Sequence, residues 1–174
     1  ESGDRIVKRA DREGLKVAVA HQAVYLPQIQ EIKRMLDDGR IGQVVAIHAV
    51  GKQDHRGGGE DMLVLGTHQF NLMRYLVGDV AWMMARVTCD GKNIGPEHVR
   101  EGQEPIGWIA GDTVTSTFTF LNGVIGTFTS RANQPEKGRS YGIEIVGLEG
   151  RLAFNGDAGK VAVFEEPIWA PWEG

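Results

Sequence analysis

The sequence has little cysteine, no long apolar run and no block of basic residues. The single cysteine, Cys89, excludes an internal disulfide framework and a cysteine-rich zinc module, and it agrees with a reducing, cytoplasmic location. No apolar run approaches the roughly 18 residues that a membrane-spanning helix needs, so we expect a soluble protein without a membrane partner. The net charge of -4 argues against nucleic acid as the main partner.

Glycine, by contrast, is abundant. The chain holds 24 glycines among 174 residues, about twice the usual share of roughly 7%. They separate periodic apolar segments, which is typical of many tight turns. A chain of this length suits one domain, or one domain with part of another.

The first 22 residues have the pattern of an αβ unit. Asp4–Glu13 is predicted to be a charged helix closed by Gly14, and Leu15–Ala20 to be an apolar strand. A lone αβ unit cannot cover both faces of its strand. We therefore expect residues 1–22 to be the tail of an α/β domain that lies upstream, and residues 23–174 to form a second domain.

The second domain begins with helical periodicity. A helix follows Pro27 and places Ile29 and Ile32 on its apolar side, and a strand is expected over Gln43–Val50. A further helix is predicted at about Glu60–Leu76. Its apolar stripe consists of Val64, Leu65, His68, Leu72, Tyr75 and Leu76.

Beyond this helix the apolar period changes from 3.6 to 2. The sequence predicts an α+β fold, in which an open, mainly antiparallel sheet of about five or six strands carries helices on one face. Asn122-Gly123 predicts a type I′ hairpin whose first strand has a threonine-rich face, and residues 90–111 are predicted to be a long loop. The remaining strands are expected at Ala81–Thr88, Tyr141–Leu148, Arg151–Phe154 and Lys160–Phe164.

The candidate chemistry lies in the loop and helix start from Asp54 to His68. Asp54, His55, Arg56 and Asp61 are polar groups close to three glycines, which permit close approach of a ligand. His68 is either a hydrogen-bonded core residue or a proton-transfer group. Arg56 is either a carboxylate or phosphate clamp or a solvated charge. His55 and His68 lack the helical spacing of paired metal ligands, so we expect no metal site.

Other motifs are weaker. No GxGxxG dinucleotide fingerprint and no GxxxxGK phosphate loop occurs. Cys89 is expected to be a packing residue. Trp169 and Trp172 are expected to seal against the sheet or a partner, with peptide binding as the alternative.

A set of short motifs in one order resembles the C-terminal half of the Gfo/Idh/MocA family (glucose-fructose oxidoreductase, inositol dehydrogenase). The resemblance covers nearly the whole chain, and its motifs are specific mainly in combination. They are the Leu15–Ala20 strand, the Pro27 helix, Gly39-Arg40-Ile41-Gly42, Gly57-Gly58-Gly59, Leu65-Gly66-Thr67-His68, Leu72–Asp79, Asn122-Gly123 and Ile143–Gly150.

The resemblance implies an oxidoreductase that uses NAD or NADP and interconverts alcohol and carbonyl on a sugar, polyol or related hydroxy compound. It implies that a Rossmann dinucleotide-binding domain, of which residues 1–22 are the tail, precedes the substrate-binding and oligomerisation domain of residues 23–174. His68 matches the family's catalytic acid/base. Asp54, His55, Arg56 and Asp61 are candidate substrate contacts, and the threonine-rich face is expected to form a homo-oligomer interface.

The sequence also departs from the family pattern. Val64 and Asn71 stand where the family often has acids, so Asp61 or Glu60 is expected to orient the imidazole of His68. A non-catalytic ligand-binding or assembly domain of the same fold is therefore the alternative. We expect the 174-residue chain alone to be inactive, because it has no site for the dinucleotide pyrophosphate.

Overall fold

The computed structural model describes residues 2–135 and 141–166. Trp169 and Trp172 lie outside these described residues. Among the described residues, no helix is both long enough and apolar enough to span a membrane. The helices are α1 (Ser2–Glu13), η1 (Gln22–Tyr25), α2 (Pro27–Asp37), α3 (Gly59–Val64), α4 (Gly66–Val77) and η2 (Pro96–His98).

One eight-stranded sheet dominates the molecule, in the order β10-β9-β8-β1-β7-β6-β2-β3. All its neighbouring strands are antiparallel except β1 and β7, which run parallel. The α+β, mainly antiparallel prediction is confirmed, although the sheet is wider than expected. Its strands are β1 (Val44–Val50), β2 (Val80–Cys89), β3 (Lys92–Asn93), β6 (Thr113–Phe120), β7 (Ile125–Arg131), β8 (Gly142–Gly147), β9 (Arg151–Asn155) and β10 (Lys160–Phe164).

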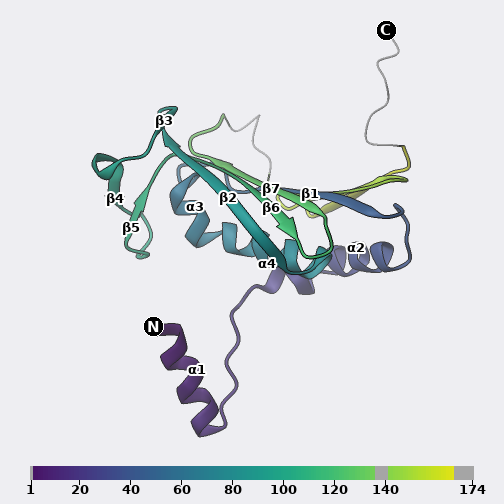
Figure 1. Cartoon of the computed structure of the whole chain (residues 1–174), viewed down its shortest axis with the longest axis horizontal. Coiled ribbons are helices and arrows are strands. Elements are labelled where there is room, and N and C mark those ends of the chain that lie inside the picture. Colours follow the sequence, from purple (N-terminus) through teal and green to yellow (C-terminus); the bar gives the residue numbers. More distant parts are fainter. Residues whose placement is uncertain (1, 136–140, 167–174) are drawn as a thin grey trace.

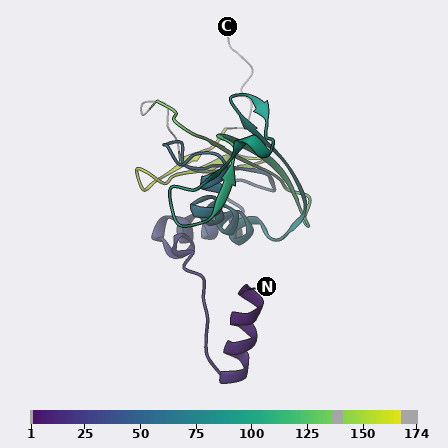
Figure 2. The ribbon, with the colours of Figure 1, turned by 90° about the vertical axis from the view of Figure 1, so that its left-hand side faces the viewer.

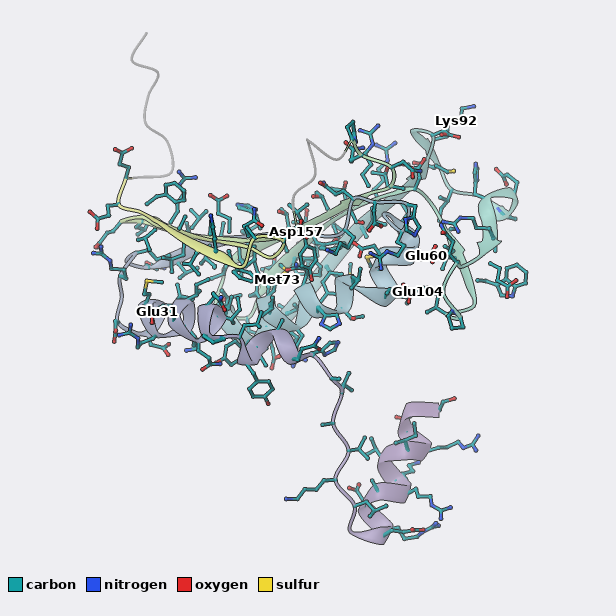
Figure 3. All side chains as sticks on the ribbon, turned by 180° about the vertical axis from the view of Figure 1, so that it is seen from behind. Glu31, Glu60, Met73, Lys92, Glu104 and Asp157 are labelled. Carbon is teal, nitrogen blue, oxygen red and sulfur yellow. The ribbon has the colours of Figure 1, made fainter. Side chains whose placement is uncertain are left out.

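Helices α2, α3 and α4 cover one face of this sheet, and the other face is open (Figures 1 and 2). Alternation along the strands explains the arrangement, because successive side chains point to opposite faces. In β6, Val114, Phe118 and Phe120 are buried, while the threonines between them face outward. Met73 of α4 lies between its helix and the sheet (Figure 3) and is 1% exposed.

The N-terminal segment stands apart from this body. Helix α1 lies away from the sheet, joined to it by an extended stretch (Figures 1 and 2). The prediction of a strand at Leu15–Ala20 is wrong for this structure, since the stretch has extended backbone but no ladder. A strand needs a neighbour to satisfy its backbone groups, and no neighbour is present among the described residues. Leu15, Val17 and Val19 are therefore exposed.

The predicted helix at Glu60–Leu76 is two helices. The break falls at Leu65 and Gly66, where a Cβ on Gly66 would lie 3.0 Å from the carbonyl oxygen of Asp61 and 3.2 Å from Phe128. The new helix direction changes the buried stripe. It consists of Gly66, Gln69, Leu72, Met73, Leu76 and Val77, so the prediction that Val64, Leu65 and Tyr75 share it with Leu72 and Leu76 was only partly right.

The long loop predicted for residues 90–111 is partly ordered. It contains β3, η2 and a second, two-stranded sheet of β4 (Val99–Glu101) and β5 (Trp108–Ala110). We call residues 90–111 the arm, because they project beyond the end of the main sheet (Figure 1). The arm's strands are only two or three residues long, too short for sequence periodicity to reveal.

The β6–β7 hairpin occurs where it was predicted, but its turn is not type I′. That turn needs positive φ at both central residues, whereas only Gly123 has a positive φ here. The backbone N–H of Gly123 donates to the carbonyl of Phe120. The amide of Asn122 holds the turn, donating to the Val77 carbonyl at 2.7 Å and accepting from the Val124 N–H at 3.2 Å. The link to α4 therefore decides the turn geometry.

Candidate functional site

Gly57, Gly58 and Gly59, at the start of α3, allow their loop to pack closely against the ends of neighbouring strands. A Cβ at Gly57 would lie 2.4 Å from the backbone nitrogen of Ala132, and one at Gly59 would lie 2.0 Å from the carbonyl oxygen of Ala110. Gly58 has φ 81° and ψ -133° and would bring a Cβ 2.4 Å from the carbonyl carbon of Asp112. The glycines thus fix where α3 begins, and α3 in turn places the start of α4.

The predicted substrate contacts in this loop are engaged with one another and with the arm. Arg56 donates to both carboxylate oxygens of Asp54, at 3.2 Å and 2.7 Å, and its other terminal nitrogen lies 3.5 Å from Glu104. These hydrogen bonds lower the pKa of Asp54 to about 2 and raise that of Arg56. The side chain of His55 is exposed. None of these residues lines the cavity at His68.

Glu60 of α3 binds the arm through hydrogen bonds. Its side chain is fully buried and accepts hydrogen bonds from the backbone of Gln103 and Glu104, at 2.8 Å and 3.0 Å (Figure 3). Arg100 donates to its second oxygen at 3.4 Å. A buried carboxylate with several donors is a stable structural anchor. Glu60 therefore organises the arm, and neither Glu60 nor Asp61 is among the groups that shift the pKa of His68, which are burial and His21.

Asp61 is a buried carboxyl group without a hydrogen-bond partner among the described residues. It fits only because residue 51 is glycine, where a Cβ would lie 2.0 Å from Asp61 Oδ2. Burial raises the pKa of Asp61 to about 6, and the Ser130 hydroxyl and Lys52 backbone N–H nearby offset part of that rise. Asp61 does not line the cavity at His68.

We expect Asp61→Asn to stabilise the fold above pH 6. The folded-state pKa of Asp61 is about 6, against an ordinary value of 3.8, so the native state binds the proton more tightly and loses stability as pH rises between these values. The loss is about 3 kcal/mol at neutral pH. Urea unfolding at several pH values measures it. The gain from asparagine should vanish near pH 4, and a gain that is the same at every pH would contradict this assignment.

His68 lies in the first turn of α4, next to a second histidine. The rings of His68 and His21 meet edge to face, with centroids 5.1 Å apart and an interplanar angle of 79°. Burial lowers the pKa of His68, and the neighbouring His21 lowers it further. A neutral imidazole can accept a proton, so His68 is poised as a base.

A cavity of about 330 Å³ opens beside His68, between η1, α4 and the β8–β9 end of the sheet. We call it the His68 cavity. Its walls are mostly apolar, and the polar groups are few and convergent, as in small-molecule sites. It is lined by Gln22, Ala23, Leu26, Lys52, Leu65, His68, Gln69, Leu72, Tyr141, Phe154 and Gly156.

Besides His68 and Gln22, three polar side chains line this cavity: Lys52, Gln69 and Tyr141. Lys52 lies 4.3 Å above the ring of Tyr141 and pairs with Asp157 at 3.1 Å. Burial raises the pKa of Tyr141, and the charge of Asp61 raises it further. Gln69 is 1% exposed, and its side-chain oxygen has no hydrogen-bond partner in the described part of the chain. A hydroxyl group on a ligand would supply the missing donor.

The structure thus joins His68 to residues that the sequence did not single out. His21, Lys52, Gln69 and Tyr141 come from four separate segments, and no spacing rule links them. The sequence grouped four other polar residues with His68 because they are close in the chain, but none of them lines the His68 cavity: Arg56 pairs with Asp54 and Glu104, His55 is exposed, and Asp61 is buried beside Gly51. Their assignment as substrate contacts stays a prediction.

The described residues do not form a metal site or a dinucleotide site. They contain no group of three or more His, Cys, Asp or Glu side chains that converge on one point. A dinucleotide pyrophosphate needs a glycine-rich turn between a strand and a helix N-terminus. Gly57-Gly58-Gly59 does not fit this requirement, because backbone atoms of Ala132, Asp112 and Ala110 occupy the space beside the three glycines.

Comparison with known proteins places this chain in a family. The sequence model of the GFO/IDH/MocA C-terminal domain matches residues 29–153. A levoglucosan dehydrogenase of Pseudarthrobacter phenanthrenivorans is 24% identical over 153 residues, which are 74% of this chain and 39% of the relative.

Solved structures give the same result for the fold. A levoglucosan dehydrogenase in complex with NADH and L-sorbose matches with a TM-score of 0.68 and 21% identity, over 87% of this chain and 44% of that one. The WlbA dehydrogenase from Bordetella pertussis, in complex with NADH and UDP-GlcNAcA, matches with a TM-score of 0.68 and 19% identity. The match covers 95% of this chain and 49% of that one. The chain therefore spans less than half the length of these relatives.

Proposed function

This chain belongs to the GFO/IDH/MocA family of oxidoreductases, and from that premise we propose that it is the substrate-binding and oligomerisation part of a dehydrogenase. The whole protein would oxidise a hydroxyl group of a sugar, polyol or related compound with NAD or NADP. An upstream dinucleotide-binding domain would hold the cofactor, so the 174-residue chain alone would not catalyse hydride transfer. Residues 1–22 would be the tail of that domain, and residues 23–174 would be this part.

The observation that supports this proposal best is the His68 cavity. It combines a neutral imidazole with an unpartnered buried oxygen on Gln69 and with the hydroxyl of Tyr141. The hydroxyl groups of a polyhydroxylated ligand would donate to the side-chain oxygen of Gln69, which has no donor among the described residues. The C–H faces of such a ligand suit the apolar walls of Leu65, Leu72 and Phe154. A volume of about 330 Å³ accommodates one monosaccharide-sized ring.

In the proposed reaction His68 handles the proton. His68 would accept the hydroxyl proton of the substrate and return it in the reverse reaction. The chemistry that NAD or NADP would supply when bound is acceptance of the hydride from the carbinol carbon. Burial lowers the pKa of His68 and so favours the neutral imidazole before the reaction. Asp54, His55 and Arg56 remain proposed substrate contacts, for parts of a larger substrate that reach beyond the His68 cavity.

The open face of the sheet would form the oligomer interface. We call it the open face: it carries the outward residues of β2, β6, β7 and β10, among them the exposed side chains Trp82, Met84, Ile125 and Phe164. Exposed large apolar side chains on a sheet face that no helix covers indicate an interaction site. A second copy of the chain, with the same face, is the proposed partner.

We expect Trp82→Glu to convert the oligomer into a monomer. Trp82 is 52% exposed on the open face, and a carboxylate there would lose its hydration in the interface. Light scattering on a sizing column gives the absolute mass. Trp108→Glu is the matched control, because Trp108 is 74% exposed but lies on the arm. A wild-type chain that is already monomeric on dilution would contradict the interface.

A substrate panel tests the proposed activity. The longer protein with its upstream domain is incubated with NAD or NADP and with levoglucosan, L-sorbose, inositol or UDP-activated sugars, and reduced nicotinamide is followed by absorbance. Turnover with at least one hydroxy compound is the expected result. Binding of such compounds without any reduction of nicotinamide would instead favour the non-catalytic ligand-binding domain.

A further inference from the structure

His21 is the titratable group in ring contact with His68. It lies at the end of the extended segment that leads from α1, and its ring meets that of His68 at 5.1 Å. His21 also lines a separate hollow of about 560 Å³ together with Thr67, Asn71 and Arg74 of α4. It thus stands between this hollow and the imidazole that faces the His68 cavity.

We propose that His21 is a positioning residue that holds His68 in its neutral, proton-accepting form. Two imidazoles in edge-to-face contact cannot both carry a proton without repulsion in a partly buried place. Whenever His21 is protonated, protonation of His68 therefore costs more. The inference rests on the proposed function in that His68 is taken as the proton acceptor.

The other charged groups around His68 are paired or neutral, which leaves His21 as the group that acts on it. Lys52, which lines the His68 cavity just after β1, pairs with Asp157. Arg74, which lines the hollow beside His21, pairs with Asp79. On the sheet side Tyr141 faces the cavity, and burial favours its neutral form. Neither these groups nor Asp61 are among the causes of the lowered pKa of His68, which are burial and His21.

The arrangement makes the protonation of His68 depend on the extended segment. His21 N–H donates to the Val19 carbonyl at 2.8 Å, so the place of the ring follows the backbone of residues 19–21. While this segment holds the ring of His21 against α4, the imidazole of His68 remains neutral down to a lower pH and can still accept a proton there. The expected benefit for a dehydrogenase is a wider pH range for alcohol oxidation.

Two substitutions of His21 test this coupling by NMR. His21→Phe keeps an aromatic ring against His68 but cannot carry charge, and His21→Gln keeps a polar group without the ring. The Cε1–H signals of the histidines, five in the wild type and four in each variant, are titrated against pH. We expect the midpoint of His68 to move to higher pH in both variants, and its curve to change from a shallow, coupled form to a single-site form.

His98→Phe is the matched control, since His98 lies in η2 of the arm, where its ring accepts a hydrogen bond from Gly95. It should leave the titration of His68 unchanged. An unchanged His68 midpoint in both His21 variants would overturn the inference. The NMR titration needs no substrate or cofactor. It therefore tests the coupling of His21 and His68 even if the protein turns over no compound of the substrate panel. In an active longer protein, the acid limb of the kcat/KM profile should also move to higher pH in both His21 variants.

Discussion

His68→Ala is expected to reduce hydride transfer by the longer protein about 10²–10⁴-fold, the usual contribution of a positioned general acid or base. The reduction should lie in kcat, because the imidazole acts on the reacting hydroxyl while Gln69, Tyr141 and the apolar walls still bind the ligand. The loss should be smallest at high pH, where hydroxide can replace the imidazole as proton acceptor. Steady-state kinetics with the best compound of the substrate panel measures both effects.

The control for this variant is His98→Gln, which removes an imidazole from the arm. Its turnover should match the wild type. Circular dichroism and thermal unfolding show whether His68→Ala keeps the fold, as expected for a side chain that is only partly buried. A folded His68→Ala protein with wild-type turnover would remove His68 from the proposed mechanism.

The second large effect is expected for Gly58→Ala, which should destabilise the fold by roughly 3 kcal/mol. Gly58 has φ 81° with ψ -133°, a region that is essentially restricted to glycine. Its Cβ would also lie 2.4 Å from the carbonyl carbon of Asp112, which is backbone and cannot rotate away. Urea unfolding of the two chains gives the difference in free energy.

Gly91→Ala separates the two causes. Gly91 also has a positive φ, 76°, but among the described residues no atom lies within 4 Å of the place that a Cβ would take. Its cost should be about 1 kcal/mol, the penalty of the left-handed conformation alone. Equal losses at Gly58 and Gly91 would show that close packing against the strand ends contributes nothing.

The sheet and its faces were largely predictable from the sequence because a period of 2 is a local property. Val114, Phe118 and Phe120 on one face of β6, with threonines on the other, follow directly from alternation. The helix break at Gly66 was not predictable in this way. Gly66 packs closely against Phe128, which is distant in sequence, so this environment is not visible in the local pattern.

The same distinction applies to the candidate site. His68 was a candidate because it follows a glycine-rich loop, and the structure places it on a cavity. Its neighbours His21 and Tyr141 come from opposite ends of the chain, so only the fold brings them together. Asp54 and Arg56 looked available as isolated charges, but in the structure they satisfy each other. Proximity in sequence was therefore a poor guide to which polar groups share a cavity.

The position of β1 in the sheet has a consequence for how the protein must be made. β1 (Val44–Val50) pairs with β7 on one side and β8 on the other, although both are synthesised much later. Pairings between distant segments are slow to form, because the loop must close before the contacts stabilise it. During synthesis β1 has no partner strand until Ile125–Arg131 has emerged, and its other edge stays unpaired until Gly142–Gly147 has emerged. Chaperone binding to nascent chains should therefore persist late, and chains that end before β7 should aggregate.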